Sequence, residues 1–181
     1  MKLAVMTYSF SPAIKTGQTT LIDAMRFTRS LGVKGIDFLA ALYDGPPAEM
    51  KKIMQDLDVE PAIYTQTGAD FCHASAADRK PAIEKSLPAL DRGREMGFTK
   101  VMFTTGAIKE GMSRSDAARY VGEGLRPIVE RAGSLGLTVT IEDFPGPRSP
   151  HATAAECLAV CDAAGPGMRL TFDSGNVFTW N

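Results

Sequence analysis

The chain has 181 residues, 44% of them hydrophobic and 23% charged, so it is long enough to bury a core and has an ordinary globular composition. Its net charge of -1 provides no basic excess for a phosphate backbone, which argues against nucleic acid as a partner. It has no apolar run near the ~20 residues that span a bilayer, no signal peptide and only three cysteines, so we expect one cytoplasmic domain, residues 1–181, without a membrane partner.

Six short segments rich in Val, Ile, Phe and Thr recur along the chain. They are too short for buried helices, and several are apolar almost throughout, as parallel strands covered on both faces are. In chain order the expected strands are Leu3–Thr7, Gly35–Ala40, Pro61–Thr65, Lys100–Thr105, Thr138–Glu142 and Arg169–Asp173.

Helical patterns lie between these strands. In Ser113–Leu135 apolar residues recur every three or four positions and share one face. Thr153 and Glu156 have the spacing of a capping box, so another helix should begin there. Pro88 should kink the helix expected over Asp78–Met96. The remaining expected helices are Thr20–Leu31 and Ala48–Leu57.

The alternation of strands and helices predicts a parallel α/β fold with right-handed crossovers. Alternation alone does not decide between an open sheet and a barrel. The Gly-x-Gly pair Gly122 and Gly124 falls inside a helix pattern. It therefore indicates helix packing, and the sequence shows no phosphate-binding loop of a nucleotide fold.

Acidic residues follow two of the expected strands directly. Thr138–Glu142 ends in Glu142 and is followed by Asp143, and the last expected strand ends in Asp173. Such acids often cap helices or face solvent, and we expect that of Asp143. Glu142 and Asp173 would come close at the carboxyl edge of one sheet, where two like charges repel unless a cation or a proton intervenes. A hard divalent ion held by oxygens satisfies both.

The residues around these acids carry a family resemblance. The stretches Val139–Gly146, Ala154–Glu156 and Leu170–Asn176 resemble the fifth and sixth units of the xylose isomerase-like barrels, which include sugar phosphate isomerases and epimerases. The resemblance implies a (β/α)8 TIM-barrel fold, of which this chain would hold about six of the eight βα units. Since the sequence ends just past the sixth expected strand, we expect the barrel to be incomplete at its carboxyl end.

The resemblance also implies a metal site and a reaction. Family members hold a divalent ion (Mn, Mg, Co or Zn) by a Glu after strand five, an Asp after strand six, a His after strand seven and a Glu after strand eight. Glu142 and Asp173 match the first two. The implied enzyme is an isomerase or epimerase that abstracts a proton next to a ketose carbonyl, with Glu142 as ligand and acid/base. An inosose-dehydratase-like lyase, an apurinic endonuclease-type hydrolase and an inactive fragment are the alternatives.

Further residues are candidates for contact with a small sugar or sugar phosphate. Asn176 stands where many relatives have His, Arg148 lies in the loop after Glu142, and His73 lies in the loop after the third expected strand. A solvated side chain is the alternative for Arg148 and His73, and we expect His151 to lie in a surface loop. Because exposed strand edges template pairing, we also expect a homo-oligomer.

Overall fold

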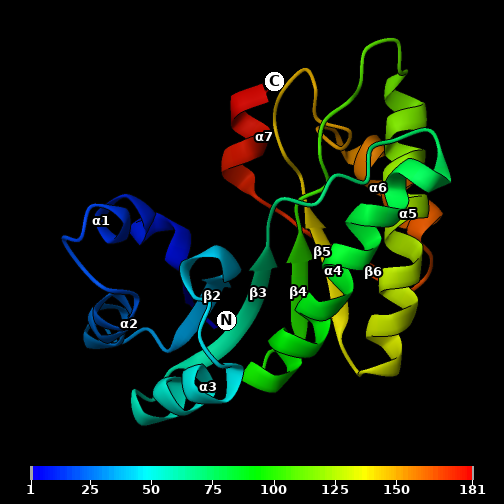
Figure 1. Cartoon of the computed structure of the whole chain (residues 1–181). Coiled ribbons are helices and arrows are strands. Elements are labelled where there is room, and N and C mark those ends of the chain that lie inside the picture. Colours follow the sequence, from blue (N-terminus) through cyan, green and yellow to red (C-terminus); the bar gives the residue numbers. More distant parts are fainter. Residues whose placement is uncertain (1, 181) are drawn as a thin grey trace.

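A parallel six-stranded sheet organises the molecule (Figure 1). The structure, a computed structural model, describes residues 2–180 and the side chains of residues 2–178. Each strand pairs in parallel with the next one along the chain. The predicted α/β fold with six units of the barrel type is therefore confirmed. The strands are β1 (Ala4–Met6), β2 (Gly35–Leu39), β3 (Glu60–Gln66), β4 (Lys100–Phe103), β5 (Thr138–Glu142) and β6 (Met168–Thr171).

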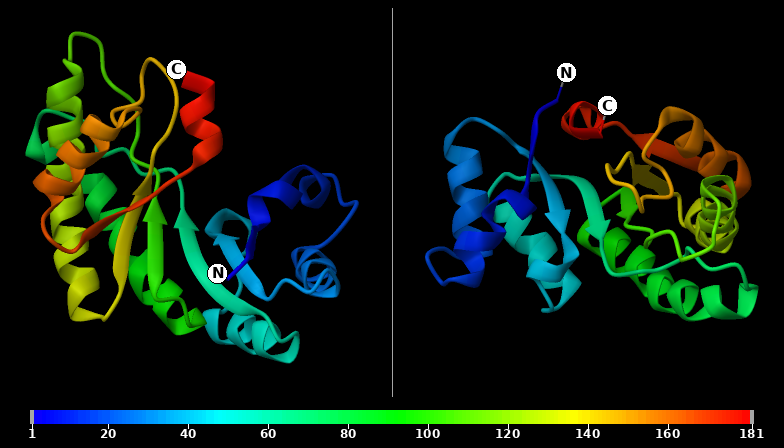
Figure 2. Two further views of the ribbon diagram at one scale, coloured as in Figure 1. Left: turned by 180° about the vertical axis from the view of Figure 1, so that it is seen from behind. Right: turned by 90° about the horizontal axis from the view of Figure 1, so that it is seen from above.

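Helices cover the convex outer side of this curved sheet, as the view from above shows (Figure 2). The long ones are α2 (Leu21–Ser30), α3 (Pro47–Asp56), α4 (Ala76–Met96), α5 (Arg114–Ser134) and α6 (Ala154–Ala164). Shorter helical segments are η1 (Thr7–Phe10), α1 (Ser11–Lys15), η2 (Ala40–Leu42) and α7 (Ser174–Trp180). In the described part of the chain, β1 and β6 are the edge strands and do not pair with each other.

Side-chain caps mark where four of the five long helices begin, namely α2, α4, α5 and α6. The capping box before α6 is confirmed, because the Glu156 N–H donates to Thr153 Oγ1 at 3.3 Å while the Thr153 N–H donates to Glu156 Oε2 at 3.0 Å. Ser113 accepts from the N–H of Asp116 at the start of α5. Helix α4 runs through Pro88 and is continuous at the site of the expected kink.

The strand ends differ from the sequence-based boundaries. Strand β6 ends at Thr171, which pairs with Glu142, so Asp173 lies two residues beyond the ladder. Strand β4 likewise ends at Phe103. The short helices η1, α1 and α7 were not predicted, since segments of one or two turns are too short to show a helical period.

Close packing of α5 against its neighbours explains the Gly-x-Gly pair. A Cβ placed on Gly122 would lie 2.4 Å from the Cβ of Ala163 and 2.6 Å from the carbonyl oxygen of Val160. A Cβ on Gly124 would meet the Phe71 side chain at 3.0 Å. The glycines therefore serve helix packing, as the sequence indicated.

The two faces of the sheet differ in polarity, and this difference positions the site. On β5, Val139 and Ile141 are fully buried in the core beneath the helices. Side chains alternate along a strand, so Thr140 and Glu142 point to the opposite, inner face. Thr171 of β6 shares that face, because its hydroxyl donates to Thr140 Oγ1 at 3.0 Å.

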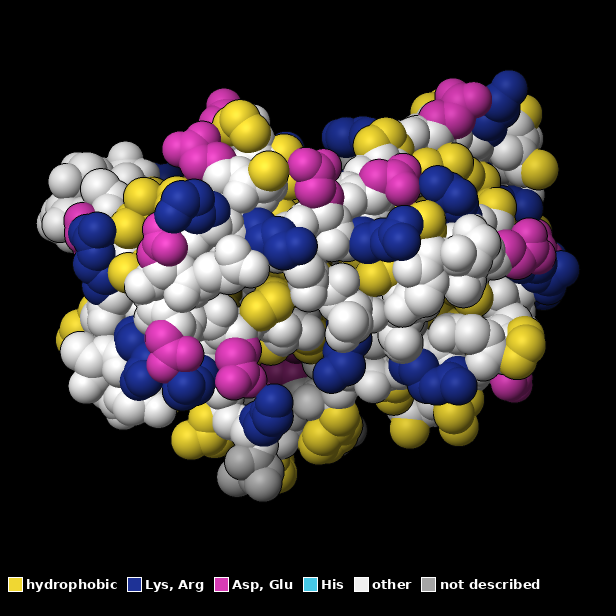
Figure 3. Space-filling view, turned by 90° about the horizontal axis from the view of Figure 1, so that it is seen from below, with side chains coloured by type: hydrophobic (Ala, Val, Ile, Leu, Met, Phe, Trp, Pro, Cys, Tyr) yellow, Lys and Arg dark blue, Asp and Glu magenta, His cyan; other side chains and the backbone are white. Residues whose placement is uncertain are grey.

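The face seen from below shows no dominant charge (Figure 3). Lys and Arg side chains are interspersed there with Asp and Glu. Within the described residues, no helix is both long and apolar enough to cross a membrane.

Candidate functional site

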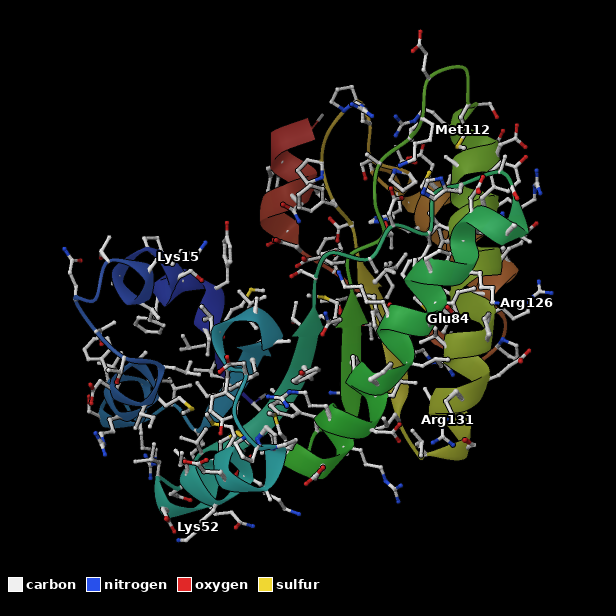
Figure 4. All side chains as sticks on the ribbon, viewed as in Figure 1. Lys15, Lys52, Glu84, Met112, Arg126 and Arg131 are labelled. Carbon is white, nitrogen blue, oxygen red and sulfur yellow. The ribbon has the colours of Figure 1, made fainter. Side chains whose placement is uncertain are left out.

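Glu142 and Asp173 lie at the same edge of the sheet. Glu142 is the last residue of β5, and Asp173 follows β6, whose last residue Thr171 is its register partner. Loops gather at this end of the molecule, which Met112 of the β4–α5 loop marks in Figure 4. The Asp173 charge acts on Glu142, so the two carboxyl groups lie near each other.

Asp143 fixes the position of Asp173. Its side chain is only 6% exposed, and Oδ1 accepts the backbone N–H of Asp173 at 2.7 Å. Its carbonyl oxygen accepts Nδ2 of Asn176 at 2.7 Å. Asp173 in turn accepts the N–H of Gly175 through Oδ1 at 2.8 Å. Asp143 is thus structural, as expected, and joins the end of β5 to the start of α7.

The electrostatics at this edge disfavour charge on Glu142. Burial raises the pKa of its carboxyl from 4.5 to about 7, and the negative charges of Asp173, Asp143 and Asp37 add to that effect. Among the described residues, none of the ion pairs involves Glu142 or Asp173. A bound cation or a proton would relieve this repulsion.

The donor set at this edge suits part of a divalent metal site. Glu142 and Asp173 provide carboxylate oxygens, the ligands that hard divalent ions prefer. Within the described residues, no group of three or more His, Cys, Asp or Glu is placed to hold a metal ion. Glu142 and Asp173 match two of the four ligands that the family resemblance implies.

Asp37 is an inner-face acid that the sequence analysis did not single out. It sits on β2, and Thr65 of β3 donates to its Oδ1 at 2.7 Å. Burial raises its pKa, and the Thr65 hydrogen bond partly opposes that rise. The available signal was its position between Ile36 and Phe38, since a polar residue alternating with buried apolar ones must face the other side.

A cavity of about 120 Å³ lies beside Glu142 at the ends of β4 and β5. Its walls include His151, and the expectation that His151 lies in a surface loop was wrong. The ring is only 5% exposed, and Nε2 lies 2.6 Å from the hydroxyl of Thr105. Burial lowers the pKa of His151 to about 4, so the ring is neutral near pH 7. The loop after β5 folds back over β4, a long-range contact that local sequence does not reveal.

The three predicted substrate contacts occupy different places. Asn176 lies next to the acids through its bond to Asp143. Arg148 donates from Nε to the carbonyl of Ile108 at 3.3 Å. The Nε2 of His73 lies 3.4 Å from Oδ2 of Asp70. Neither Arg148 nor His73 lines the cavity beside Glu142.

Known proteins share this fold and this arrangement of strands. A sequence profile of the family described as "Xylose isomerase-like TIM barrel" matches residues 25–181. None of the curated proteins matches the chain. Protein SMc04130 from Sinorhizobium meliloti 1021 is 22% identical, with a TM-score of 0.76, over 96% of this chain and 63% of that one.

Two further solved structures are similar. The IOLI protein with a bound zinc atom is 13% identical, with a TM-score of 0.80, over 97% of this chain and 64% of that one. D-psicose 3-epimerase in the presence of D-fructose is 17% identical, with a TM-score of 0.77, over 99% of this chain and 65% of that one. At these identities the similarity shows the fold alone. The chain spans slightly less than two thirds of the length of each of these proteins.

Proposed function

The chain belongs to the xylose isomerase-like TIM barrel family, and from that premise we propose that it acts on a small sugar or sugar phosphate as a divalent-metal-dependent isomerase or epimerase. One observation carries the proposal. Glu142 and Asp173 lie close together at the carboxyl ends of neighbouring strands, where burial and the repulsion of nearby acids raise the pKa of Glu142 to about 7. Active sites of such barrels gather at this end of the strands.

Glu142 and Asp173 would hold the metal ion, which is Mn, Mg, Co or Zn. When bound, such an ion supplies Lewis-acid chemistry that polarises a ketose carbonyl and so acidifies the neighbouring C–H. Asp143 keeps the second ligand in place through its bond to the backbone of Asp173. Two similar solved structures support the proposal of a divalent metal and an epimerase reaction, since one carries zinc and the other is named as an epimerase.

Glu142 is the proposed acid/base. Its carboxylate would take the proton from the carbon next to the carbonyl and return it to the product. The raised pKa belongs to the metal-free site, and a bound divalent ion would favour the carboxylate, which is the form that accepts a proton. The acid/base for the opposite face of the substrate, expected after strand eight, has to come from outside residues 1–181.

Asn176, Arg148 and His73 are proposed substrate contacts. Asn176 is the best placed of them, because its side chain is anchored directly beside the two acids. Arg148 and His73 hold loops at the same end of the sheet and would act on more distant groups of the substrate.

Proton exchange tests this proposal directly. The protein as encoded, including any residues beyond Asn181, is loaded with Mn²⁺ and incubated with ketoses in D₂O. We expect deuterium to enter at the carbon next to the carbonyl, as followed by proton NMR. The Glu142→Gln variant should lose the exchange, while the exposed Glu130→Gln of α5 should retain it. Exchange that persists in Glu142→Gln would contradict the assignment.

A further inference from the structure

The cavity beside Glu142 has the size of a small substrate group. Its volume of about 120 Å³ compares with roughly 30 Å³ for one water molecule in the liquid, so a few heavy atoms fit. It opens between the β4–α5 loop and the β5–α6 loop. The lining residues are Met102, Phe103, Thr104, Thr105, Gly106, Glu142, Phe144, Ser149 and His151.

The walls of this cavity contain no basic side chain. Glu142 is their only acid. The cations of the neighbouring loops have partners outside the cavity, since Lys109 pairs with Asp70, Arg114 pairs with Glu156, and Arg148 donates to the carbonyl of Ile108. An anionic group in the cavity would find no Lys or Arg side chain in the walls to balance its charge.

Two buried polar side chains meet at this cavity. Thr105 is 3% exposed and His151 is 5% exposed, and their bond joins Oγ1 to Nε2 at 2.6 Å. The other ring nitrogen of His151, Nδ1, is buried and makes no hydrogen bond of normal geometry in the described part of the chain, although the backbone groups of His151 and Glu142 act on the ring. Buried polar atoms are nearly always hydrogen-bonded, so Nδ1 marks a place for an additional polar group.

We propose that this cavity binds an uncharged hydroxymethyl end of the substrate, with its hydroxyl bonded by His151 and its carbon packed against Met102 and Phe144. The inference rests on the proposed function and narrows it. The substrate group that enters beside Glu142 carries no phosphate, and His151 with Thr105 determines this specificity.

The two histidines of the chain make a direct binding test practical. The 181-residue chain, labelled with ¹⁵N-histidine, is titrated with glycerol as a neutral hydroxymethyl probe and with inorganic phosphate as an anionic probe. We expect glycerol to shift the His151 nitrogen resonances in a saturable manner and phosphate to leave them unchanged. Any of three outcomes would overturn the proposal. The His151 nitrogen resonances could stay unchanged at molar glycerol, they could respond equally to phosphate, or the shifts could be confined to His73.

A pair of conservative variants separates recognition from folding. Thr105→Val removes the hydroxyl at nearly constant volume, and we expect glycerol affinity to fall by about fivefold to tenfold, as for the loss of one hydrogen bond. Thr105→Ser keeps the hydroxyl and should restore most of the affinity. Equal affinity in Thr105→Val and the unaltered chain, with the fold intact by circular dichroism, would contradict the role of this pair.

Kinetics with the protein as encoded extend the test to turnover. His151→Gln keeps a polar group and His151→Leu removes it, so the leucine variant should show about a tenfold higher KM for a neutral ketose with a smaller change in kcat. Glycerol binding at His151 does not depend on turnover. If glycerol binds at His151 but Glu142-dependent proton exchange is absent, the proposed function fails and the subsite stands. If proton exchange is present but glycerol does not bind at His151, only the subsite is contradicted.

Discussion

Replacing Glu142 by Gln should stabilise the metal-free chain at alkaline pH. The carboxyl is half-buried beside Asp173 and Asp143, and its pKa rises from 4.5 to about 7 on folding. The unfolded chain therefore releases this proton at lower pH than the folded chain does. Stability is highest below pH 4.5, falls as the pH rises to about 7, and stays low above it. Gln has nearly the same shape and no charge, so it removes this loss.

The size of the effect follows from the pKa shift. A rise from 4.5 to about 7 corresponds to roughly 3 kcal/mol. Because Glu142 retains some contact with solvent and its charge is shared among several acids, we expect about 1–3 kcal/mol at pH 8. For a chain of this length each kcal/mol moves Tm by about 2–4 °C.

Urea unfolding in the presence of EDTA measures this difference. Glu142→Gln and the unaltered chain are compared at pH 8 and pH 4.5, with the exposed Glu130→Gln as the matched control. We expect a gain in the free energy of unfolding for Glu142→Gln at pH 8 and almost none at pH 4.5. A loss of stability at pH 8, or the same difference at both pH values, would refute the electrostatic reasoning.

Two further changes probe the support of the site. Asp143→Ala should lower the free energy of unfolding by about 1–3 kcal/mol, because the N–H of Asp173 loses its acceptor. It should also weaken Mn²⁺ binding, and unchanged Mn²⁺ affinity would show that Asp143 does not support the site. Gly122→Ala should cost about 1–3 kcal/mol in thermal unfolding through the clash with Ala163, whereas Gly133→Ala, with open space around its Cβ, should stabilise α5 by a few tenths to about 1 kcal/mol. Equal effects at the two glycines would contradict the packing.

The sequence predicted the sheet well because buried strands leave a strong signal. The expected strand Thr138–Glu142 has the same bounds as β5, so the position of Glu142 at the carboxyl end of this strand was predicted correctly. The predicted end of β6 at Asp173 was wrong by two residues. The last ladder pair is at Thr171, and the chain runs on to Asp173 without pairing. The capping box at Thr153 located α6 to the residue.

The features that were missed depend on contacts between distant segments. His151 is buried because its loop reaches Thr105, 46 residues earlier in the chain. Asp37 acts on Glu142 only because the curved sheet turns both toward one interior. The hydrogen bond from Asn176 to the carbonyl of Asp143 anchors helix α7, and the sequence of this short helix has no periodic pattern that predicts it. The single domain and the homo-oligomer stay predictions.

Shared binding of one divalent ion by Glu142 and Asp173 is the claim on which the proposed function depends. Mn²⁺ titration of the 181-residue chain, followed by electron paramagnetic resonance of the free ion, measures it directly. We expect one site whose affinity falls by about tenfold or more in both Glu142→Gln and Asp173→Asn, since each removes one of few carboxylate ligands. The exposed Asp162→Asn of α6 should leave the affinity unchanged. Mn²⁺ affinity that is the same in all four proteins would contradict the claim.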